Sequence, residues 1–409
     1  MINSGDTAWV LISSALVMLM TPALAFFYGG MVRRKNMLSV LMQCFIILCV
    51  LSIQWVLIGY SLSFAPNKGF WGGFAWFGLN NVGLEPYADY AATIPHQAFM
   101  IFQAMFAIIT PALIIGAFAE RMKFSSFLIF TLLWATFVYD PLCHWVWGLG
   151  GWLRNLGALD FAGGTVVHIN AGIAALVTAL IIGRRKNLER NVPTPHNMPF
   201  VVLGTGLLWF GWFGFNAGSA LAANGLAVNA FVVTNTAAAS AGLSWALIEW
   251  LRNGKPTIFG VASGAVAGLV AITPAAGFVS VIPAIIIGLL VSVFCFTAVS
   301  IIKPRLGYDD SLDAFGVHCV GGIWGALATG LFASKAVNPL GANGLFFGNP
   351  RQFVIQLATV AVTIVYTFIM TVILYKLVNA IMGMRVDEKE ELIGLDLTQH
   401  HERAYTLLE

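Results

Sequence analysis

Long apolar runs alternate with short polar segments along most of the chain. A membrane-spanning helix needs roughly 20 predominantly apolar residues, and eleven runs approach or exceed that length. They lie near residues 6–31, 37–64, 97–120, 124–147, 161–183, 198–221, 228–250, 258–278, 281–302, 315–333 and 353–382. We therefore predict an all-α polytopic membrane domain of eleven helices over residues 1–384, followed by a cytosolic regulatory tail over residues 385–409.

Composition and charge support this class of protein. Hydrophobic residues make up 59% of the chain and charged residues only 10%, whereas soluble domains are about a quarter charged. The net charge of +3 is too small to indicate a nucleic acid partner. Seventeen Lys and Arg residues, including Arg190, fall on one side of the predicted membrane and four on the other. Because basic loops stay in the cytosol, we expect an outside N-terminus, a cytosolic C-terminus and a place in the cytoplasmic membrane.

Two of the predicted helices share a pattern around one histidine. Residues 167–176 read VHINAGIAAL and residues 317–327 read VHCVGGIWGAL, so His318 repeats His168 at a distance of 150 positions. Small residues lie one helical turn from each histidine, which favours close helix approach. These are the fifth and tenth predicted helices, so halves over about 1–185 and 197–335 would cross the membrane in opposite directions. Such inverted repeats are typical of transporters with a midplane site. The long eleventh helix, over about 350–384, has no counterpart.

The two histidines are the main candidates for chemistry. Ionisable groups at membrane depth are costly and usually face a cavity or one another. Each ring could be satisfied separately by a backbone carbonyl, but the matched positions of His168 and His318 favour a facing pair. In an apolar bore the rings would stay neutral, with one donating its N–H to the other and both lining a path for a small polar molecule or a proton. We expect no cofactor, and no metal because a catalytic metal generally takes three protein ligands.

Two carboxylates stand near the starts of these helices. Asp160 opens the helix of His168, and Asp313 opens the helix of His318. Either residue suits an N-terminal cap, where the helix dipole favours a negative charge. For Asp160 the alternative is a direct ligand for a cation.

Aromatic residues gather toward the outer ends of two predicted helices. Trp147 ends helix 4, and residues 209–215 near the end of helix 6 read WFGWFGF, with Ser219 following. This arrangement fits an interfacial aromatic belt. It also fits a site where ring faces and a hydroxyl attract a small cation.

Seven motifs spread over the whole chain share one resemblance. They read TPALAFFYGGMVRRKN, FQAMFAIITPALIIGAFAERMKF, HWVWG, DFAGGTVVHINAGIAALVTALIIGRR, GWFGFNAGSAL, DAFGVHCVGGIWGALATGLFA and GLDLTQHHERAY. Together they resemble the ammonium transporter family (Amt/Mep/Rh), and within it the prokaryotic Amt branch. The resemblance implies transport of ammonium or ammonia, with methylammonium as an analogue, and no enzymatic activity.

The resemblance also assigns roles near the outer mouth. Phe106, Trp147 and Ser219 would recruit ammonium, with Phe102 beside them. Phe106 and Phe215 would be the stacked rings that gate the pore below this site.

Further roles follow for the bore. His168 and His318 would be the twin histidines that line it, and Asp160 would organise the outer site without touching the ion. Trp212 and Thr273 match further positions of the family near the pore.

The family implies partners as well. Its members are homotrimers in the lipid bilayer with one pore per subunit, and many prokaryotic members are closed by a PII signalling protein at the cytosolic face. The tail motif of the family reads H-G-E-x-A-Y, whereas His401 takes the place of the glycine here. A glycine at that position suits a positive φ, so regulation by PII is less firmly implied than transport. Ala23 also replaces a common glycine in helix 1.

The predicted mechanism addresses selectivity against K⁺, which has nearly the size of ammonium but no proton to lose. Ammonium would lose a proton near the Phe106–Phe215 gate and pass the histidines as NH₃. The proton would either follow, making uptake electrogenic, or return outside. The alternatives are an ammonium sensor with little transport, an intramembrane metalloenzyme, and a pore whose main substrate is methylamine, CO₂ or water.

Overall fold

The computed structural model describes residues 1–186 and 194–405. Part of the basic loop at 184–197, including Arg190, and the last four residues of the tail lie outside the described residues. Within the described ranges the regular elements are helical, apart from one isolated bridge between Met122 and Arg385. Ten of these helices are long and apolar enough to cross a membrane. The prediction of an all-α polytopic membrane protein is therefore confirmed.

The helical segments follow the predicted apolar runs closely. The α-helices are α1 (Ser4–Met31), α2 (Met37–Gln54), α3 (Tyr60–Phe64), α4 (His96–Phe118), α5 (Phe124–Trp134), α6 (Asp140–Trp147), α7 (Trp152–Leu156), α8 (Asn170–Ile182), α9 (Met198–Ala217), α10 (Gly225–Asn253), α11 (Ile258–Ile272), α12 (Val281–Thr297), α13 (Lys303–Leu306), α14 (Val320–Phe332), α15 (Pro350–Met382), α16 (Glu388–Ile393) and α17 (Leu395–His400). Wide π-helical turns join consecutive pieces of one span: η2 (Trp55–Gly59), η4 (Ala135–Tyr139), η5 (Gly164–Ile169), η7 (Ala298–Ile302) and η8 (Phe315–Cys319). Short 3₁₀ turns complete the set: η1 (Arg34–Asn36), η3 (Phe77–Leu79), η6 (Gly218–Ala220) and η9 (Leu345–Phe347).

One predicted span is shorter than expected. The apolar run at 258–278 is helical only over α11, which has 15 residues. Pro274 follows directly after the C-cap and cannot donate a backbone hydrogen bond, so the helix ends there. The chain then turns over residues 273–278 before α12 begins at Val281.

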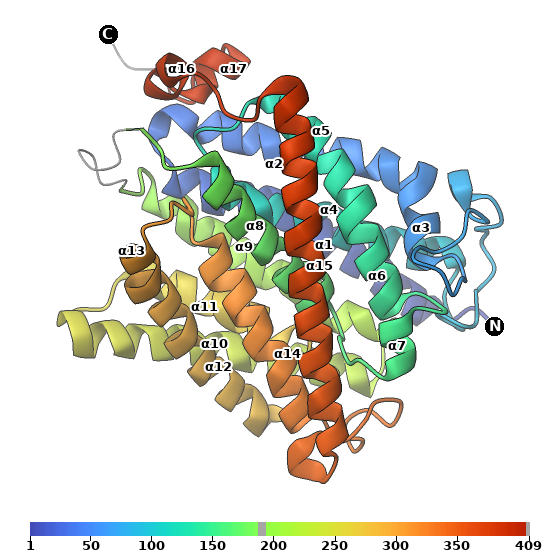
Figure 1. Ribbon diagram of the computed structural model, residues 1–409. Helices are drawn as coiled ribbons and strands as arrows, with labels where there is room; N and C mark the ends of the chain where they lie inside the picture. Colours follow the sequence, from blue (N-terminus) through green and yellow to red (C-terminus); the bar gives the residue numbers. More distant parts are fainter. Residues whose placement is uncertain (187–193, 406–409) are drawn as a thin grey trace.

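The helices run between two faces of the molecule. Figure 1 shows the N-terminus at one end and α16 and α17 at the opposite end, with α15 running along the bundle between them. The loop at 65–95 lies beside the N-terminus, since the amide of Asn3 donates to the carbonyl of Thr93. We call this end the N face and the end with the tail the C face.

Small residues let the helices approach closely inside the bundle. A Cβ atom added at Gly204 of α9 would lie 2.4 Å from the backbone nitrogen of Phe27 of α1. Conversely, large apolar side chains such as Leu251, Ile282 and Ile381 are exposed on the outside of the bundle. Small residues at helix contacts and apolar residues at the periphery are the expected distribution for helices in lipid.

A buried ionic network joins loops at the C face. Glu120 accepts hydrogen bonds from Arg33 and Arg185, and Arg185 also pairs with Asp309 at 2.8 Å. Burial opposes ionisation of both acids, but the charges and hydrogen bonds of the arginines prevail. They lower the pKa of Glu120, and they lower the pKa of Asp309 to about 2. The network therefore stays ionised at neutral pH and holds four loops together.

The tail packs against the same face. Asn36 accepts a hydrogen bond from the amide of Leu395 at 2.8 Å, and Asp396 accepts one from the amide of Ser39 at 2.8 Å. His401 ends α17 with φ 56°, in the left-handed region. The expectation that this position takes a positive φ is confirmed, and a histidine adopts it in place of the family's glycine.

Candidate functional site

The helix of His168 begins with a wide turn that Asp160 holds in place. The Asp160 carboxylate accepts hydrogen bonds from the amides of Gly163, Gly164, Thr165 and Val166, and from the Thr165 hydroxyl. These amides have no partner within the helix, and the positive end of the helix dipole favours the carboxylate. Asp160 therefore caps the helix of His168, as one of the two interpretations of the sequence held.

The second histidine helix begins in the same way, but with a different acid from the one predicted. Asp310, eight positions before His318 as Asp160 is eight before His168, accepts from the amide of Phe315 at 2.8 Å. Asp313 instead has φ 61° and pairs with Lys303 at 2.6 Å. The prediction that Asp313 caps this helix is therefore wrong. The helix begins with the wide turn η8, and its first amide donates to the acid five residues earlier, Asp310. Burial raises the pKa of Asp310 to about 6.

The structure brings the two histidines together. The ring centroids of His168 and His318 lie 5.4 Å apart, with planes 13° from parallel, and both residues are buried. Neither nitrogen of His168 nor Nδ1 of His318 has a hydrogen-bond partner. The expectation that one ring donates its N–H to the other is therefore wrong for this structure. Buried polar atoms normally have partners, so these nitrogens are available to a small polar molecule beside the rings.

Glycines allow the two histidine helices to meet. A Cβ atom added at Gly172 would lie 2.4 Å from the backbone nitrogen of Cys319, directly after His318. A Cβ atom added at Gly322 would lie 3.1 Å from the Cβ of His168. Two members of the predicted small-residue stripes, Gly172 and Gly322, thus lie where the two helices touch, whereas Gly325 faces Ala271.

Two aromatic rings and one hydroxyl fix the surroundings of His168. The Trp212 ring lies nearly parallel to the His168 ring at 5.5 Å, and the Phe215 ring lies 6.1 Å away. The Trp212 indole N–H donates to the Thr273 hydroxyl at 2.8 Å. Trp212 is therefore locked by Thr273 and supports the imidazole from one side.

A cavity of about 240 Å³ opens at the N face, between that face and the two histidines. Phe106, Trp147 and Ser219 line it, and the ring centroids of Phe106 and Trp147 lie 5.9 Å apart. Phe102 contacts Phe106 at 5.0 Å, but it is fully buried and does not line the cavity. On the side of the histidines, the ring centroids of Phe106 and Phe215 lie 4.4 Å apart, and this contact closes the inner end of the N-face cavity.

Two smaller cavities lie between the Phe106–Phe215 contact and the C face. A cavity of about 10 Å³ is lined by Phe215, His168 and His318, and another of about 20 Å³ is lined by His318 and Asp313. Each has room for about one water-sized molecule. The two small cavities share His318, so they form one narrow bore. Among the described residues, the N-face cavity shares no lining residue with this bore, and the contact between Phe106 and Phe215 lies between them.

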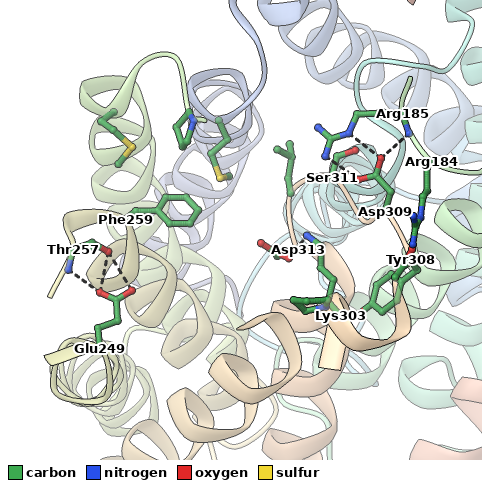
Figure 2. Close-up of a pocket in the computed structure, with 16 residues that line it drawn as sticks. Arg184, Arg185, Glu249, Thr257, Phe259, Lys303, Tyr308, Asp309, Ser311 and Asp313 are labelled. Carbon is green, nitrogen blue, oxygen red and sulfur yellow. Dashed lines mark hydrogen bonds and ion pairs between the residues drawn. The ribbon is translucent and has the colours of Figure 1, made fainter. Parts of the chain in front are cut away.

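The bore ends in a wide vestibule at the C face, with a volume of about 820 Å³. Figure 2 shows Glu249, Thr257 and Phe259 on one wall and Lys303 and Asp313 on the other. Glu249 accepts from the amide and hydroxyl of Thr257. The polar groups on the walls of the vestibule thus bind one another through hydrogen bonds and an ion pair, whereas the bore has mainly apolar walls.

Three residues of the N-face cavity that carry polar or charged groups are not predicted from the sequence. Gln103, Tyr90 and Arg154 all line it, and the side-chain oxygen of Gln103 is buried without a partner. Gln103 lies one position after Phe102 and three before Phe106, so helical spacing would have placed it near the site. Tyr90 and Arg154 come from loop and short-helix segments whose positions have no periodic signal.

The described residues offer little for a metal ion. Among residues 1–186 and 194–405, no three His, Cys, Asp or Glu side chains converge in a way that could hold one. The chemistry of the bore rests on two imidazoles and apolar walls.

Comparison with known proteins decides the family. The model of the Ammonium Transporter Family matches residues 8–405. The chain belongs to the ammonium transporter family. It is 53% identical over 401 residues to an ammonium transporter of Bacillus subtilis (strain 168), covering 98% of each chain.

Solved structures of the ammonium transporter family agree with this assignment. Mep2 of Saccharomyces cerevisiae matches with a TM-score of 0.89 at 39% identity, covering 95% of this chain and 91% of that one. A protein described as a sensor Amt protein also matches, with a TM-score of 0.89 at 30% identity, covering 97% of this chain and 98% of that one.

Proposed function

We propose that this protein transports ammonium across the cytoplasmic membrane by passing its nitrogen through the histidine bore as NH₃. The observation that carries the proposal is the pair of buried, nearly parallel imidazoles below the Phe106–Phe215 contact, with unpaired ring nitrogens beside a water-sized cavity. Membership of the ammonium transporter family supports the choice of substrate, with methylammonium as its analogue. No covalent change beyond proton transfer is needed, so the proposal describes a transporter and not an enzyme.

Recruitment would occur in the N-face cavity. The ring faces of Phe106 and Trp147 attract a cation by about 0.5–2 kcal/mol, depending on how far it is desolvated. The Ser219 hydroxyl donates to the carbonyl of Phe215 at 2.8 Å, which leaves its oxygen lone pairs for the N–H groups of an ammonium ion. Phe102 would act from behind Phe106, and Asp160 would act by fixing the loop around the site.

Selectivity would arise at the Phe106–Phe215 gate. An apolar bore one molecule wide cannot replace the hydration shell of a permanent cation. Ammonium escapes this cost by losing a proton, after which NH₃ passes as a neutral molecule that the nitrogens of His168 and His318 can hydrogen-bond. K⁺ has no such option. Whether the proton follows the histidines separates electrogenic transport from a gas-like channel, and an ammonium-dependent current distinguishes the two.

The orientation and partners complete the proposal. The basic residues gather at the C face, so this face would lie in the cytosol and the N face outside. The matched pairs Asp160–His168 and Asp310–His318 support two inverted halves within about residues 1–185 and 197–335, with α15 outside the repeat. As in the family that the sequence resembles, the protein would form homotrimers, and a PII-type protein would dock at the C face beside the tail.

An ammonium sensor with little transport is the alternative function. It is favoured by the structural match to the sensor Amt protein. The bore argues for transport, because a sensor needs only the N-face cavity and not the small cavities beside His168 and His318 on the far side of the Phe106–Phe215 contact.

Uptake by purified protein in proteoliposomes tests the proposed function. With the membrane potential clamped, labelled methylammonium and ammonium should accumulate faster than in protein-free liposomes. Saturable binding without uptake above that background would favour the sensor and reject transport. Metal analysis of the same preparation addresses the metalloenzyme, which requires stoichiometric metal.

A further inference from the structure

A guanidinium group lines the cavity that would recruit a cation. Arg154 comes from the short helix α7 (Trp152–Leu156) and lines the N-face cavity together with Phe106, Trp147 and Ser219. A positive charge is unexpected there, because it repels the proposed substrate. Its contacts show how it is held.

Arg154 is fixed by groups that do not neutralise it. Its Nη1 donates to the carbonyl of Trp147 at 2.6 Å, and its guanidinium carbon lies 5.7 Å above the centre of the Tyr90 ring. Among the ion pairs between described residues, none involves Arg154. The Trp147 indole N–H in turn donates to the carbonyl of Asp160 at 2.8 Å.

The other ionisable groups that line the cavity form no ion pair with Arg154. The Asp160 carboxylate also lines the cavity, but its oxygens accept hydrogen bonds from backbone amides and the Thr165 hydroxyl at the start of its helix. The Tyr90 hydroxyl donates to the carbonyl of Phe64 at 2.6 Å, and burial raises its pKa, so the phenol stays neutral. Arg154 therefore leaves the lining with a positive charge that has no carboxylate partner of its own.

A fixed positive charge acts differently on the two forms of the substrate. It raises the energy of a bound ammonium ion, while it leaves NH₃ almost unaffected. The same charge also repels K⁺, which cannot relieve the repulsion by losing a proton. The field thus weakens retention of any cation and favours loss of a proton by the one cation able to lose it.

We propose that Arg154 is a specificity-determining residue whose charge drives deprotonation of ammonium in the N-face cavity. The inference rests on the proposed function, since it concerns the fate of ammonium at the same site. In the step, one N–H bond of ammonium breaks, the nitrogen keeps the electron pair, and water carries the proton out of the cavity to the solution at the N face, so that the positive charge leaves the field of Arg154. Arg154 neither gains nor loses a proton and acts only through its field and its hold on Trp147.

Kinetics of charge variants in proteoliposomes test the inference. Arg154→Gln removes the charge but keeps a donor for the Trp147 carbonyl, Arg154→Lys keeps the charge, and Arg351→Gln removes an exposed arginine at the start of α15 that does not line the cavity. For Arg154→Gln we expect KM for ammonium to fall about three- to tenfold and kcat to fall by a similar factor, since a tenfold effect needs only a modest change in Coulomb energy. Its rate should also depend more steeply on rising external pH. Arg351→Gln should behave like the unchanged protein, and Arg154→Lys, which keeps the charge but not the stacking on Tyr90, should lie closer to the unchanged protein than Arg154→Gln does.

A second measurement needs no variant. Salt screens a field in a water-accessible cavity, so KM of the unchanged protein should fall as sodium chloride rises from low to physiological concentration, and this trend should vanish in Arg154→Gln. Equal kinetics for Arg154→Gln and the unchanged protein would overturn the inference. So would equal defects in Arg154→Gln and Arg154→Lys, because the side chain would then serve only to hold Trp147. If the unchanged protein transports no ammonium, the proposed function itself fails, which is a different outcome.

Discussion

His168 carries two ring nitrogens into the interior of the bundle, and neither has a partner in the protein. Trp212 supports one face of the ring at 5.5 Å, and His318 faces it at 5.4 Å. A buried polar group without a hydrogen bond costs about 1–3 kcal/mol. At the residue scale, this cost is what a small polar molecule relieves when it enters the bore.

Replacement of His168 by alanine removes this polar contact. We expect His168→Ala to lower selective ammonium uptake at least about tenfold, because a hydrogen bond to the passing NH₃ is lost where no water replaces it. Uptake by proteoliposomes, with K⁺ flux measured in parallel, checks the prediction. Unchanged ammonium flux with K⁺ still excluded would contradict the role given to the imidazole.

Replacement of Phe215 acts on the gate alone. Phe215→Ala removes the ring that lies 4.4 Å from Phe106, while Phe106, Trp147 and Ser219 remain in the N-face cavity. We expect ammonium binding at this cavity to persist within about threefold, because cation–π attraction to the remaining rings is unchanged, while exclusion of K⁺ weakens. Ammonium binding measured calorimetrically, together with K⁺ flux, tests this. Loss of binding with no K⁺ leak would place the role of Phe215 in the recruiting site and not in the gate.

At the scale of elements, the two histidine helices illustrate what the sequence predicts and what it does not. The shared pattern predicted both helices, their small-residue stripe and the facing histidines. The same offset of 150 positions connects Asp160 with Asp310, yet Asp313 was assigned the capping role because it lies nearer to the helix start. A wide first turn changes which acid reaches the amides, and apolar periodicity does not reveal such a turn.

Other features depend on contacts between different helices, which the pattern along a single helix does not show. The expected hydrogen bond between the imidazoles is missing because ring orientation depends on neighbours such as Trp212, which comes from a different helix. Arg154 looked like an ordinary basic residue of a loop, since nothing in the sequence of α7 shows that it lines the cavity. Pro274 marks the early end of α11, but the prediction of a full span rested on the length of the apolar run at 258–278.

Gly172 tests the contact between the two histidine helices. In Gly172→Ala the new methyl group would lie 2.4 Å from the backbone nitrogen of Cys319, so α8 and η8 must separate. Overpacking of this kind costs about 1–3 kcal/mol. We expect a lower thermal unfolding midpoint in detergent and reduced ammonium flux.

A second glycine provides the matched control for this prediction. Gly206→Ala in α9 places a methyl group where nothing lies within 4 Å, so stability and flux should not fall. Equal stability of Gly172→Ala and Gly206→Ala would contradict the close contact between the histidine helices.

At the scale of the whole molecule, the ionic network at the C face connects the ends of several spans and the tail. Asp309 joins Arg185, which joins Glu120. Asn36 contacts both Glu120 and Leu395 of the tail, and Glu391 of the tail accepts from the amide of Lys186. Because the folded pKa of Asp309 is about 2, below that of an unfolded aspartate, its contribution to stability is present above about pH 4. The contribution is lost as the pH falls toward 2.

Asp309→Asn removes the charge from this network. We expect the variant to lose about 3 kcal/mol of stability, because Arg185 loses a buried partner. The difference from the unchanged protein should be constant between pH 5 and 8 and shrink below about pH 4. Thermal unfolding in detergent across this range measures it. Glu388→Gln breaks an exposed pair with Lys186 and serves as the control, with little expected effect.

The proposed mechanism depends on one property of the bore, namely that it conducts a substrate able to lose a proton and excludes one that cannot. The direct test compares ammonium flux with K⁺ flux through the unchanged protein in proteoliposomes, at equal concentrations and the same clamped potential. The proposed mechanism predicts ammonium flux well above protein-free liposomes and K⁺ flux no greater than theirs. K⁺ flux comparable to that of ammonium would mean that an intact cation passes the two histidines, and it would contradict the proposed mechanism.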